Sequence, residues 1–424
     1  MRIPKGFDKK LADAIRRFVS DASLPMRRAF TLIELLIVIT ILSILSLVVI
    51  LILNGPSILQ QTRDATRLSD LTTLNTALNA YEAEGGGTAP LGSSSIVYVS
   101  IPDPTATTTA GDQCQGLNLV SIPSSYTYHC AASSTFKSTN GKGWIPINLA
   151  ASVTGSPIDN LPVDPVNQAQ TFQYYTYVTN GSQFQIYGHL ESSKYQPQES
   201  QTNGYDPASY KVGTNINIAP FAGGLAAYWP MNEGSGSSIN DLSGYGNTGT
   251  IYGATWMSSG CNGSANCLSF DGTDDYVQAP ANILNNPALT ICAWIWLPPP
   301  PSTAKDGVIG NDGTGMGVAY DSSALAWSNL FVGIVTPEYS LTYNAWQYIC
   351  GTRDINGITN LYVNGALLVT GNEPVNTTNN PTIIGGDWSG GSATNNYQGD
   401  TSNIRIYNRA LSQTEIRVLY ASGG

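Results

Sequence analysis

The sequence predicts an α+β region, with a long N-terminal helix and a small antiparallel sheet, followed by an all-β sandwich. Three observations lead to this prediction. Residues 30–53 are almost wholly apolar, and a helical pattern of leucines continues towards residue 84. Short β-type runs replace that pattern from residue 88, and from residue 221 they alternate with Gly, Asn and Asp turns. With 424 residues, the chain is long enough for two or three domains.

The composition favours water-exposed strand and turn structure over a helical cytosolic enzyme. Charged residues make up only 11% of the chain, whereas Gly (43), Pro (24) and Tyr (23) are abundant. The net charge of the chain is −10, and many of its Lys and Arg residues lie before residue 30. The chain after residue 30 therefore lacks the clustered positive charge that binding to nucleic acid requires. Two histidines, His129 and His189, offer little for a Ser-His-Asp triad or a histidine-rich metal site.

The first long apolar run predicts a membrane helix. Residues 35–53 carry no charge, and about 20 such residues span the hydrocarbon of a bilayer. The preceding residues 1–29 are rich in Lys and Arg, so we expect a cytoplasmic N-terminus and an exported C-terminal part. A removable signal peptide is the alternative, but its apolar core is usually shorter and residues 51–56 offer no small-residue cleavage site.

A lone carboxylate, Glu34, lies inside the apolar stretch, where an ionisable group suggests a function. The surrounding sequence, Arg-Arg-Ala-Phe-Thr-Leu-Ile-Glu at residues 27–34, resembles the type IV prepilin processing motif. The resemblance implies that a prepilin peptidase removes residues 1–29 by cutting between Ala29 and Phe30, and methylates the amine of Phe30. It also implies that Glu34 pairs with the amine of a neighbouring pilin subunit during assembly.

The motif departs from the family pattern in two places. Ala29 stands where the family usually has Gly, and we expect processing to tolerate this small residue. The leader is long, and Met26 is an alternative start that would leave a very short one.

The predicted membrane and assembly helix covers residues 30–54, and a pilin-like head covers residues 55–217. Gly55 and Pro56 interrupt the helix, and apolar residues at helical spacing then predict an amphipathic helix over residues 57–84. The members of this apolar stripe are Leu68, Leu71, Leu74, Leu78 and Tyr81, and Arg63, Asp64, Arg67 and Asp70 lie off it.

The rest of the head predicts a small sheet. Residues 96–99 form a β-type run, and residues 174–178 and 183–187 flank Asn180-Gly181 as a hairpin. Residues 210–214 offer a last strand. The arrangement is similar to the small sheet of pilins and pseudopilins.

All six cysteines follow the predicted span, on the oxidising side of the membrane. Six cysteines allow fifteen pairings. Their positions in the predicted domains favour Cys114–Cys130 in the head, Cys261–Cys267 as a short loop and Cys292–Cys350 across two strands. A zinc site is not expected because no thiolates or histidines cluster at metal spacing.

Residues 221–424 predict a two-sheet sandwich because many short strands alternate with turns, including a hairpin around Asn364-Gly365. Five ordered motifs, at residues 227–249, 268–277, 289–294, 362–365 and 404–412, resemble the laminin-G-like jelly roll of the concanavalin A-like lectin/glucanase superfamily. The resemblance implies a jelly-roll sandwich and a structural calcium ion. Oxygen ligands for calcium are available at Asp241, Asn247 and Asp400, although Asp241 and Asn247 could instead only close a turn.

We expect no enzyme activity. Asp274 and Asp275 invite comparison with the paired carboxylates of glycosidases, but adjacent strand residues point to opposite faces, and the Glu-x-Asp-x-x-Glu signature of glucanases on this fold is absent. Four aromatic residues either stack on sugar rings or fill the edge of the sandwich: Trp327, Tyr339, Trp388 and Tyr397.

The sequence thus predicts a single-pass membrane protein, displayed extracytoplasmically as a pilin-like filament subunit, whose lectin-like domain binds a glycan, a protein or a neighbouring cell surface. Its expected partners are the membrane, the prepilin peptidase and other pilin subunits. Two alternatives stay open: a pseudopilin of a secretion or DNA-uptake system, and a tethered exported glycosidase.

Overall fold

The computed structural model describes residues 31–52, 55–87, 89–105, 114, 116–153, 155–199, 201, 204–262, 264–299, 305–319, 324–327, 334–338 and 340–423. The chain forms two compact units, Met1–Ile58 and Leu59–Gly424.

Helix α2 (Leu32–Ile52) begins with a capping box. The Thr31 hydroxyl accepts a hydrogen bond from the Glu34 N–H (3.2 Å), and Glu34 Oε2 accepts from the Thr31 N–H (2.9 Å) and hydroxyl (2.8 Å). The predicted membrane segment, residues 35–53, ends at a residue outside the described part of the chain. Among the described residues, no helix is both long and apolar enough to cross a membrane.

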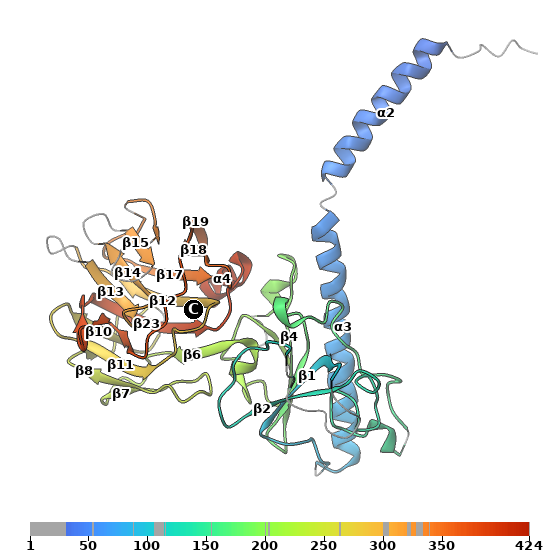
Figure 1. Cartoon of the computed structure of the whole chain (residues 1–424), viewed down its shortest axis with the longest axis horizontal. Helices are drawn as coiled ribbons and strands as arrows, with labels where there is room; N and C mark the ends of the chain where they lie inside the picture. The colour runs from blue at the N-terminus through green and yellow to red at the C-terminus, as the bar shows by residue number, and fades with distance from the viewer. Residues whose placement is uncertain are drawn as a thin grey trace, which may run out of the picture. The chain divides into compact units, whose positions relative to one another are not determined.

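Helix α3 (Gly55–Glu84) carries the predicted apolar stripe, and this stripe forms the core of the head. Leu71, Leu74 and Leu78 are fully buried and pack in one cluster with Tyr177 and Ile186 of the small sheet. Figure 1 shows α3 beside β1 and β4 of that sheet. The amphipathic pattern therefore identified correctly which face of the helix meets the sheet.

The small sheet has the order β2-β1-β3-β4-β5. Its strands are β1 (Ile96–Asp103), β2 (Thr127–Ala132), β3 (Thr176–Thr179), β4 (Phe184–Gly188) and β5 (Tyr210–Gly213). The prediction of an antiparallel sheet was wrong, because β1 and β2 run parallel. A parallel pair needs a long connection, and residues 104–126 supply one. The other pairs are antiparallel, and β3 and β4 form the predicted hairpin.

Polar residues of α3 that lie off the apolar stripe form a buried ion cluster, which the helical pattern did not predict. Arg67 is fully buried and binds Asp64 (2.8 Å), Asp164 (2.6 Å) and Glu191 (2.5 Å). Arg63 binds Glu191 from the partly exposed side of the helix. Charged contacts thus tie α3 to a loop and to the segment that follows β4.

The predicted all-β sandwich is confirmed as two large sheets with antiparallel neighbours. The first sheet has the order β19-β18-β17-β12-β23-β10-β9, with β6 also paired to β23. Its strands are β6 (Leu225–Trp229), β9 (Thr255–Met257), β10 (Cys267–Asp271), β12 (Leu289–Trp296), β17 (Trp346–Arg353), β18 (Ile358–Val363), β19 (Ala366–Asn372) and β23 (Gln398–Tyr407). The β18–β19 turn has positive φ at Asn364 (51°) and Gly365 (76°), as its Asn-Gly sequence predicts.

The second sheet has the order β16-β15-β14-β13-β20-β11-β8-β7. Its strands are β7 (Ser238–Ile239), β8 (Gly249–Tyr252), β11 (Tyr276–Ala281), β13 (Lys305–Gly310), β14 (Gly315–Ala319), β15 (Ala324–Trp327), β16 (Ile334–Val335) and β20 (Pro381–Ile384). A separate pair comprises β21 (Asp387–Ser389) and β22 (Ser392–Thr394).

The main core lies between the two large sheets and includes Trp229, Ile291, Trp327 and Ile406. A second cluster forms where α4 (Gln413–Ala421) covers the first sheet, and it joins Ile416 and Leu419 of the helix to aromatic residues of the sheet. The disulfide Cys292–Cys350 also belongs to this cluster.

The structure contains the disulfides Cys114–Cys130, Cys261–Cys267 and Cys292–Cys350, which are the predicted pairs.

The head and the sandwich, both in the second compact unit, share an interface that is aromatic and polar. Phe221 packs between Tyr126 of the head (4.7 Å between ring centroids) and Tyr245 of the sandwich (6.0 Å). The buried Tyr407 hydroxyl bonds to Asp206 (3.1 Å), and Arg409 donates to the carbonyls of Gly223 (3.0 Å) and Ala208 (3.1 Å). The division into a head at 55–217 and a sandwich at 221–424 stays a prediction.

Candidate functional site

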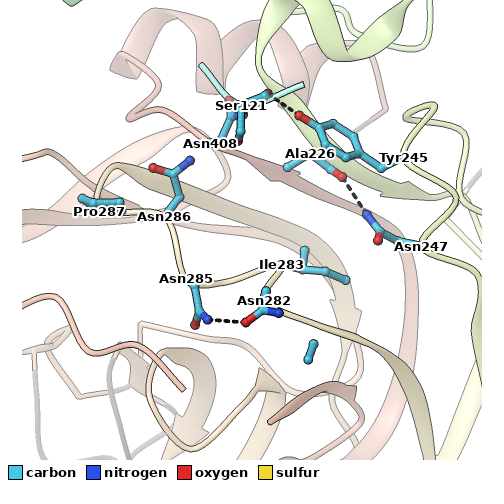
Figure 2. A pocket seen from close by; sticks show the side chains of 11 residues that line it. Ser121, Ala226, Tyr245, Asn247, Asn282, Ile283, Asn285, Asn286, Pro287 and Asn408 are labelled. Atoms are coloured by element: carbon cyan, nitrogen blue, oxygen red, sulfur yellow. Dashed lines mark hydrogen bonds between the residues drawn. The ribbon is translucent and has the colours of Figure 1, made fainter. Parts of the chain in front are cut away.

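A cavity of 460 Å³ opens where the head meets the sandwich. Figure 2 shows its lining side chains. Ser121 comes from the head, and the other lining residues come from the sandwich. Five of these are asparagines, namely Asn247, Asn282, Asn285, Asn286 and Asn408, and we call the cavity the amide pocket. Among the described residues that line it, none is charged.

One wall of the amide pocket is fixed by backbone contacts near β6 and β23. The Asn247 side chain donates to the Ala226 carbonyl (3.0 Å), and the Asn247 carbonyl accepts from the Trp229 indole (2.7 Å). Asn408, which directly follows β23, is only 5% exposed and donates to the Ser121 carbonyl (3.2 Å). Its Oδ1 is buried and accepts no hydrogen bond from any described residue.

Tyr245 adds a partly exposed aromatic ring to this wall. Its hydroxyl donates to the Ser121 carbonyl, so the head orients the ring. Burial raises the pKa of Tyr245 to about 12, which keeps the hydroxyl protonated as a donor at neutral pH.

The opposite wall is the segment that follows β11. Asn285 donates to Asn282 (2.8 Å) and to the Thr378 carbonyl (2.6 Å). Behind this segment, Arg353 is 1% exposed and donates to the carbonyls of Asn286 (3.0 Å) and Pro287 (3.1 Å). Burial lowers the pKa of Arg353 despite the nearby charge of Glu373, yet a guanidinium remains charged. A buried cation therefore holds the backbone of this wall.

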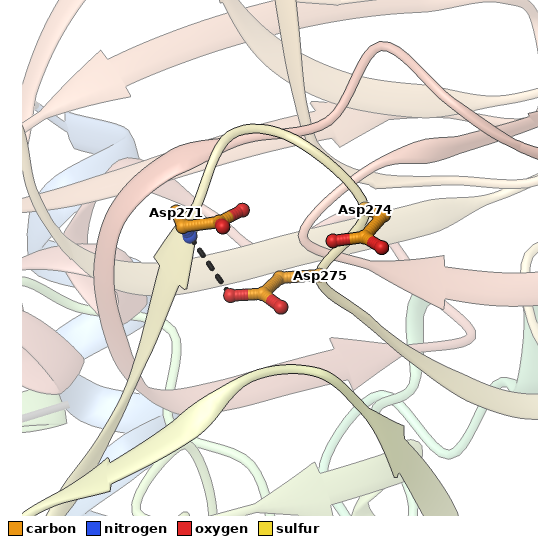
Figure 3. Close-up of side chains that lie close together, drawn as sticks. All are labelled: Asp271, Asp274 and Asp275. Carbon is orange, nitrogen blue, oxygen red and sulfur yellow. Dashed lines mark hydrogen bonds between the residues drawn. The ribbon is translucent and has the colours of Figure 1, made fainter.

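A second polar feature is an acidic cluster in the turn between β10 and β11, shown in Figure 3. Asp271, Asp274 and Asp275 offer carboxylate oxygens within 4.8 Å of one another. Asp275 is buried, and its Oδ2 accepts from the Asp271 N–H (2.9 Å). Burial, with the charges of Asp271 and Asp274, raises the pKa of Asp275 although this hydrogen bond lowers it. The three carboxylates could bind a metal ion, because hard cations prefer oxygen ligands.

The calcium ligands expected from the sequence do not come together. Asp241 closes a turn, because its two oxygens accept from the N–H groups of Tyr228 (3.0 Å), Ser243 (2.8 Å) and Asn247 (2.8 Å), and from the Ser243 hydroxyl. These contacts use the lone pairs that a cation would need. The alternative interpretation of Asp241 and Asn247, as residues that close a turn, therefore fits the geometry.

Asp400 lies away from that turn. It pairs with Ser269 and Trp296 within the first sheet, whereas Tyr228 is opposite Arg405. Five strand residues separate Asp400 from Arg405, which is roughly 16 Å at 3.3 Å per residue. Burial raises the pKa of Asp400, and a hydrogen bond with Ser269 opposes the shift.

The four aromatic candidates for sugar contact have different positions. Trp327 (1% exposed) and Tyr397 (0%) belong to the core, so the prediction that they contact a ligand was wrong. Trp327 lies on β15, and Tyr397 directly precedes β23, where its hydroxyl donates to the Trp296 carbonyl (3.0 Å). Trp388 is partly exposed and lines a separate cavity of 450 Å³ beside Gln278. Tyr339 lies outside the described residues.

The processing residues Ala29 and Phe30 also lie outside the described residues, whereas Glu34 caps α2. The amide pocket was not predicted from the sequence. A usable signal exists in the asparagine-rich segment 282–287, but its partners at residues 121, 247 and 408 are distant in the chain.

Two family models match this chain, one near its N-terminus and one in its C-terminal part. Residues 24–50 match the prokaryotic N-terminal methylation motif, and residues 271–417 match the concanavalin A-like lectin/glucanases superfamily. No curated protein matched the chain.

Among solved structures, the chain is similar to the binding domain of Paraclostridial Mosquitocidal Protein 1 (20% identity, 46% of this chain and 52% of that one, TM-score 0.37). It is also similar to a Trypanosoma rangeli sialidase (14% identity, 60% of this chain and 50% of that one, TM-score 0.39). A third similar structure is domain 4 of AbnA, a GH43 extracellular arabinanase from Geobacillus stearothermophilus, solved with arabinotriose (17% identity, 46% of this chain and 98% of that one, TM-score 0.37). The chain spans about half the length of the first two.

The chain thus combines a pilin-like N-terminus with a concanavalin A-like, lectin-type domain. The methylation motif implies export, membrane anchoring, processing by a peptidase and pilin-type assembly.

Proposed function

We propose that this protein is a subunit of a type IV pilus-like filament and displays its lectin-type domain at the cell surface for adhesion, by binding a glycan or a protein. The observation that carries the proposal is the presence in one chain of the methylation motif at residues 24–50 and the lectin-type domain at residues 271–417. Membrane insertion would occur through residues 35–53, with the N-terminus in the cytoplasm and the later domains outside.

Assembly in this proposal depends on Glu34, which would pair with the N-terminal amine of a neighbouring subunit after cleavage between Ala29 and Phe30. In the single chain, the Glu34 carboxylate is occupied by Thr31. Glu34 therefore has two separable contributions, one to the helix cap and one to assembly. Substitutions at Glu34 and at Thr31 distinguish these two contributions, because only the substitution at Glu34 removes the carboxylate.

The test measures the amount of each variant in sheared surface filaments. Glu34→Ala should reach the membrane but be depleted from filaments. Thr31→Ala is the matched control, because it weakens the same cap and retains the carboxylate, and it should be incorporated nearly as well as the wild type. Equal depletion of both variants would mean that the cap, and not the carboxylate, matters, and equal incorporation would remove the role of Glu34. Mass spectrometry of the filament subunit should find methylated Phe30 at its N-terminus.

Adhesion is tested with cells that carry filaments lacking residues 221–424. These cells should lose attachment to the surface that the wild type binds, while filament number stays the same. Unchanged attachment would favour the pseudopilin alternative, in which the exported domain contacts cargo of a secretion or DNA-uptake machine.

The proposal treats the protein as a binder and not as an enzyme. In support, the Asp274–Asp275 pair lies in the turn that connects β10 of the first large sheet to β11 of the second, and the Asp271 N–H donates to the Asp275 carboxylate. Release of reducing sugar from a glycan panel, lost on Asp275→Asn, would instead support a tethered glycosidase.

The calcium ion implied by the family resemblance would be held by Asp271, Asp274 and Asp275, because their oxygens converge and those of Asp241 and Asp400 do not. Calorimetric titration of the full chain with calcium tests this placement. The heat of binding should vanish in Asp274→Asn and persist in the control Asp354→Asn, which alters a different turn.

A further inference from the structure

We infer that the amide pocket is the ligand site of this chain, and that its ligand is an uncharged, hydroxyl-rich molecule, a short neutral oligosaccharide. The inference rests on the proposed function, since it specifies what the displayed domain binds. The cavity volume of 460 Å³ lies within the range of about 300–1,000 Å³ found for small-molecule sites.

The charge of the lining restricts the ligand. None of the described residues that line the pocket carries a charge. A carboxylate, sulfate or ammonium group that entered would lose its water without gaining an ion pair, and this desolvation is costly. The pocket therefore favours a neutral ligand over an acidic or basic one of the same size.

The hydrogen-bonding chemistry of the lining points to hydroxyl groups. An asparagine side chain carries a carbonyl acceptor and an amino donor, and each hydroxyl of a sugar both donates and accepts. The amide of Asn285 is already bonded to Asn282 and Thr378. Figure 2 shows Asn282 and Asn285 on one wall and Asn247 on another, so a ligand between them meets amides on more than one side.

The amides are held in place before any ligand arrives. Arg353 fixes the carbonyls of Asn286 and Pro287, and Asn285 is tied to the Thr378 backbone in both directions (2.6 Å and 3.2 Å). Fixed polar groups reduce the ordering cost of binding and raise selectivity. Arg353 is thus a positioning residue, and it is buried behind the wall.

The head is part of the site. Ser121 lines the pocket, and its backbone carbonyl accepts from both Tyr245 and Asn408. The pocket is therefore a composite of the pilin-like head and the lectin-type sandwich, and the sandwich by itself lacks Ser121 and the carbonyl that orients Tyr245 and Asn408.

The experiment uses the full chain in detergent micelles. It is probed with a panel of neutral di- and trisaccharides and with the same cores carrying sialic acid or sulfate. At least one neutral member should bind, and its acidic derivatives should bind about tenfold more weakly or not at all. Asn282→Ala and Asn286→Ala should each weaken binding about two- to tenfold, the range for one hydrogen bond. Asn286→Ala leaves the carbonyl that Arg353 holds, so the fold of the wall is preserved.

The control is Asn372→Ala, an exposed asparagine on the edge strand β19, which should bind like the wild type. Equal binding by the two pocket variants and the control would overturn the inference, as would stronger binding of acidic glycans. If no neutral glycan binds while wild-type filaments still mediate attachment, this inference fails and the adhesion proposal stands. If filaments mediate no attachment although the pocket binds sugar, the adhesion proposal fails and the inference stands.

Discussion

Replacing Arg67 by Met should destabilise the protein far more than the same substitution at Arg63, one helical turn earlier. Arg67 is fully buried and bonds to Asp64, Asp164 and Glu191. Methionine occupies the volume of the aliphatic part of the arginine side chain but carries no positive charge to neutralise the carboxylates. The variant would therefore leave the carboxylates of Asp64 (0% exposed) and Asp164 (2%) buried without a cation.

The magnitude follows from burial. Removing one partner of a buried ion pair costs about 3–5 kcal/mol. The Arg63–Glu191 pair has side chains 32% and 14% exposed, and partly exposed pairs contribute about 0–1 kcal/mol. If the second compact unit unfolds as one, with an unfolding entropy near 2.1 cal/mol/K per residue, Tm falls by roughly 4–6 °C for Arg67→Met and by about 1 °C at most for Arg63→Met.

The assay is thermal unfolding of the full chain in detergent, followed by near-ultraviolet circular dichroism at pH 7 and at several lower pH values. The gap between the Tm values of the two variants should narrow as the pH falls, because protonation of Glu191, whose pKa the two arginines lower, removes an ion pair that Arg63→Met retains and Arg67→Met lacks. Equal Tm values for the two variants at pH 7, or a gap that widens in acid, would refute the reasoning.

The remaining predictions concern individual carboxylates. Hydrogen bonds from Arg63 and Arg67 outweigh burial and lower the pKa of Glu191, so its stabilisation is present above its unfolded pKa and is lost as pH falls through the folded value. Glu191→Gln should therefore lower Tm at pH 7 and have little effect near pH 3, and an equal loss at both pH values would contradict this. Burial raises the pKa of Asp275, so its charged form opposes folding above that pKa. In the presence of a chelator, Asp275→Asn should have a higher Tm than the wild type at pH 7 and the same Tm near pH 3. A Tm below that of the wild type at pH 7 would contradict this prediction. Asp241→Ala removes the acceptor of four hydrogen bonds and should lower Tm equally in calcium and in chelator; a loss confined to calcium would instead make Asp241 a ligand.

Local patterns were enough to predict most of the architecture. The leucine spacing of α3 located its buried face, and the Asn-Gly turns located two hairpins, because both signals depend on neighbouring residues alone. The parallel pairing of β1 and β2 was missed because it depends on how a long connection crosses the sheet. The helical pattern placed Arg67 off the apolar stripe and could not reveal its buried ion pairs, since its partners Asp164 and Glu191 are about 100 or more positions away.

The site was harder to predict than the fold. Trp327 and Tyr397 are aromatic residues in a lectin-like domain, but residue type does not reveal whether a side chain points into the core or towards solvent, and both belong to the core. Asp241 and Asp400 offered suitable oxygens, but the strand register keeps them apart. The amide pocket joins five separate stretches of chain, so its chemistry becomes visible only when the fold brings them together.

The loop that carries Ser121 lies between Cys114 and Cys130, the two ends of a disulfide. This bond forms only after the chain leaves the reducing cytoplasm. The Ser121 contact that orients Tyr245 and Asn408 in the pocket is therefore completed late, during maturation outside the cytoplasm. If the amide pocket is the ligand site, as we propose, a newly made chain would carry that site incomplete until export and oxidation.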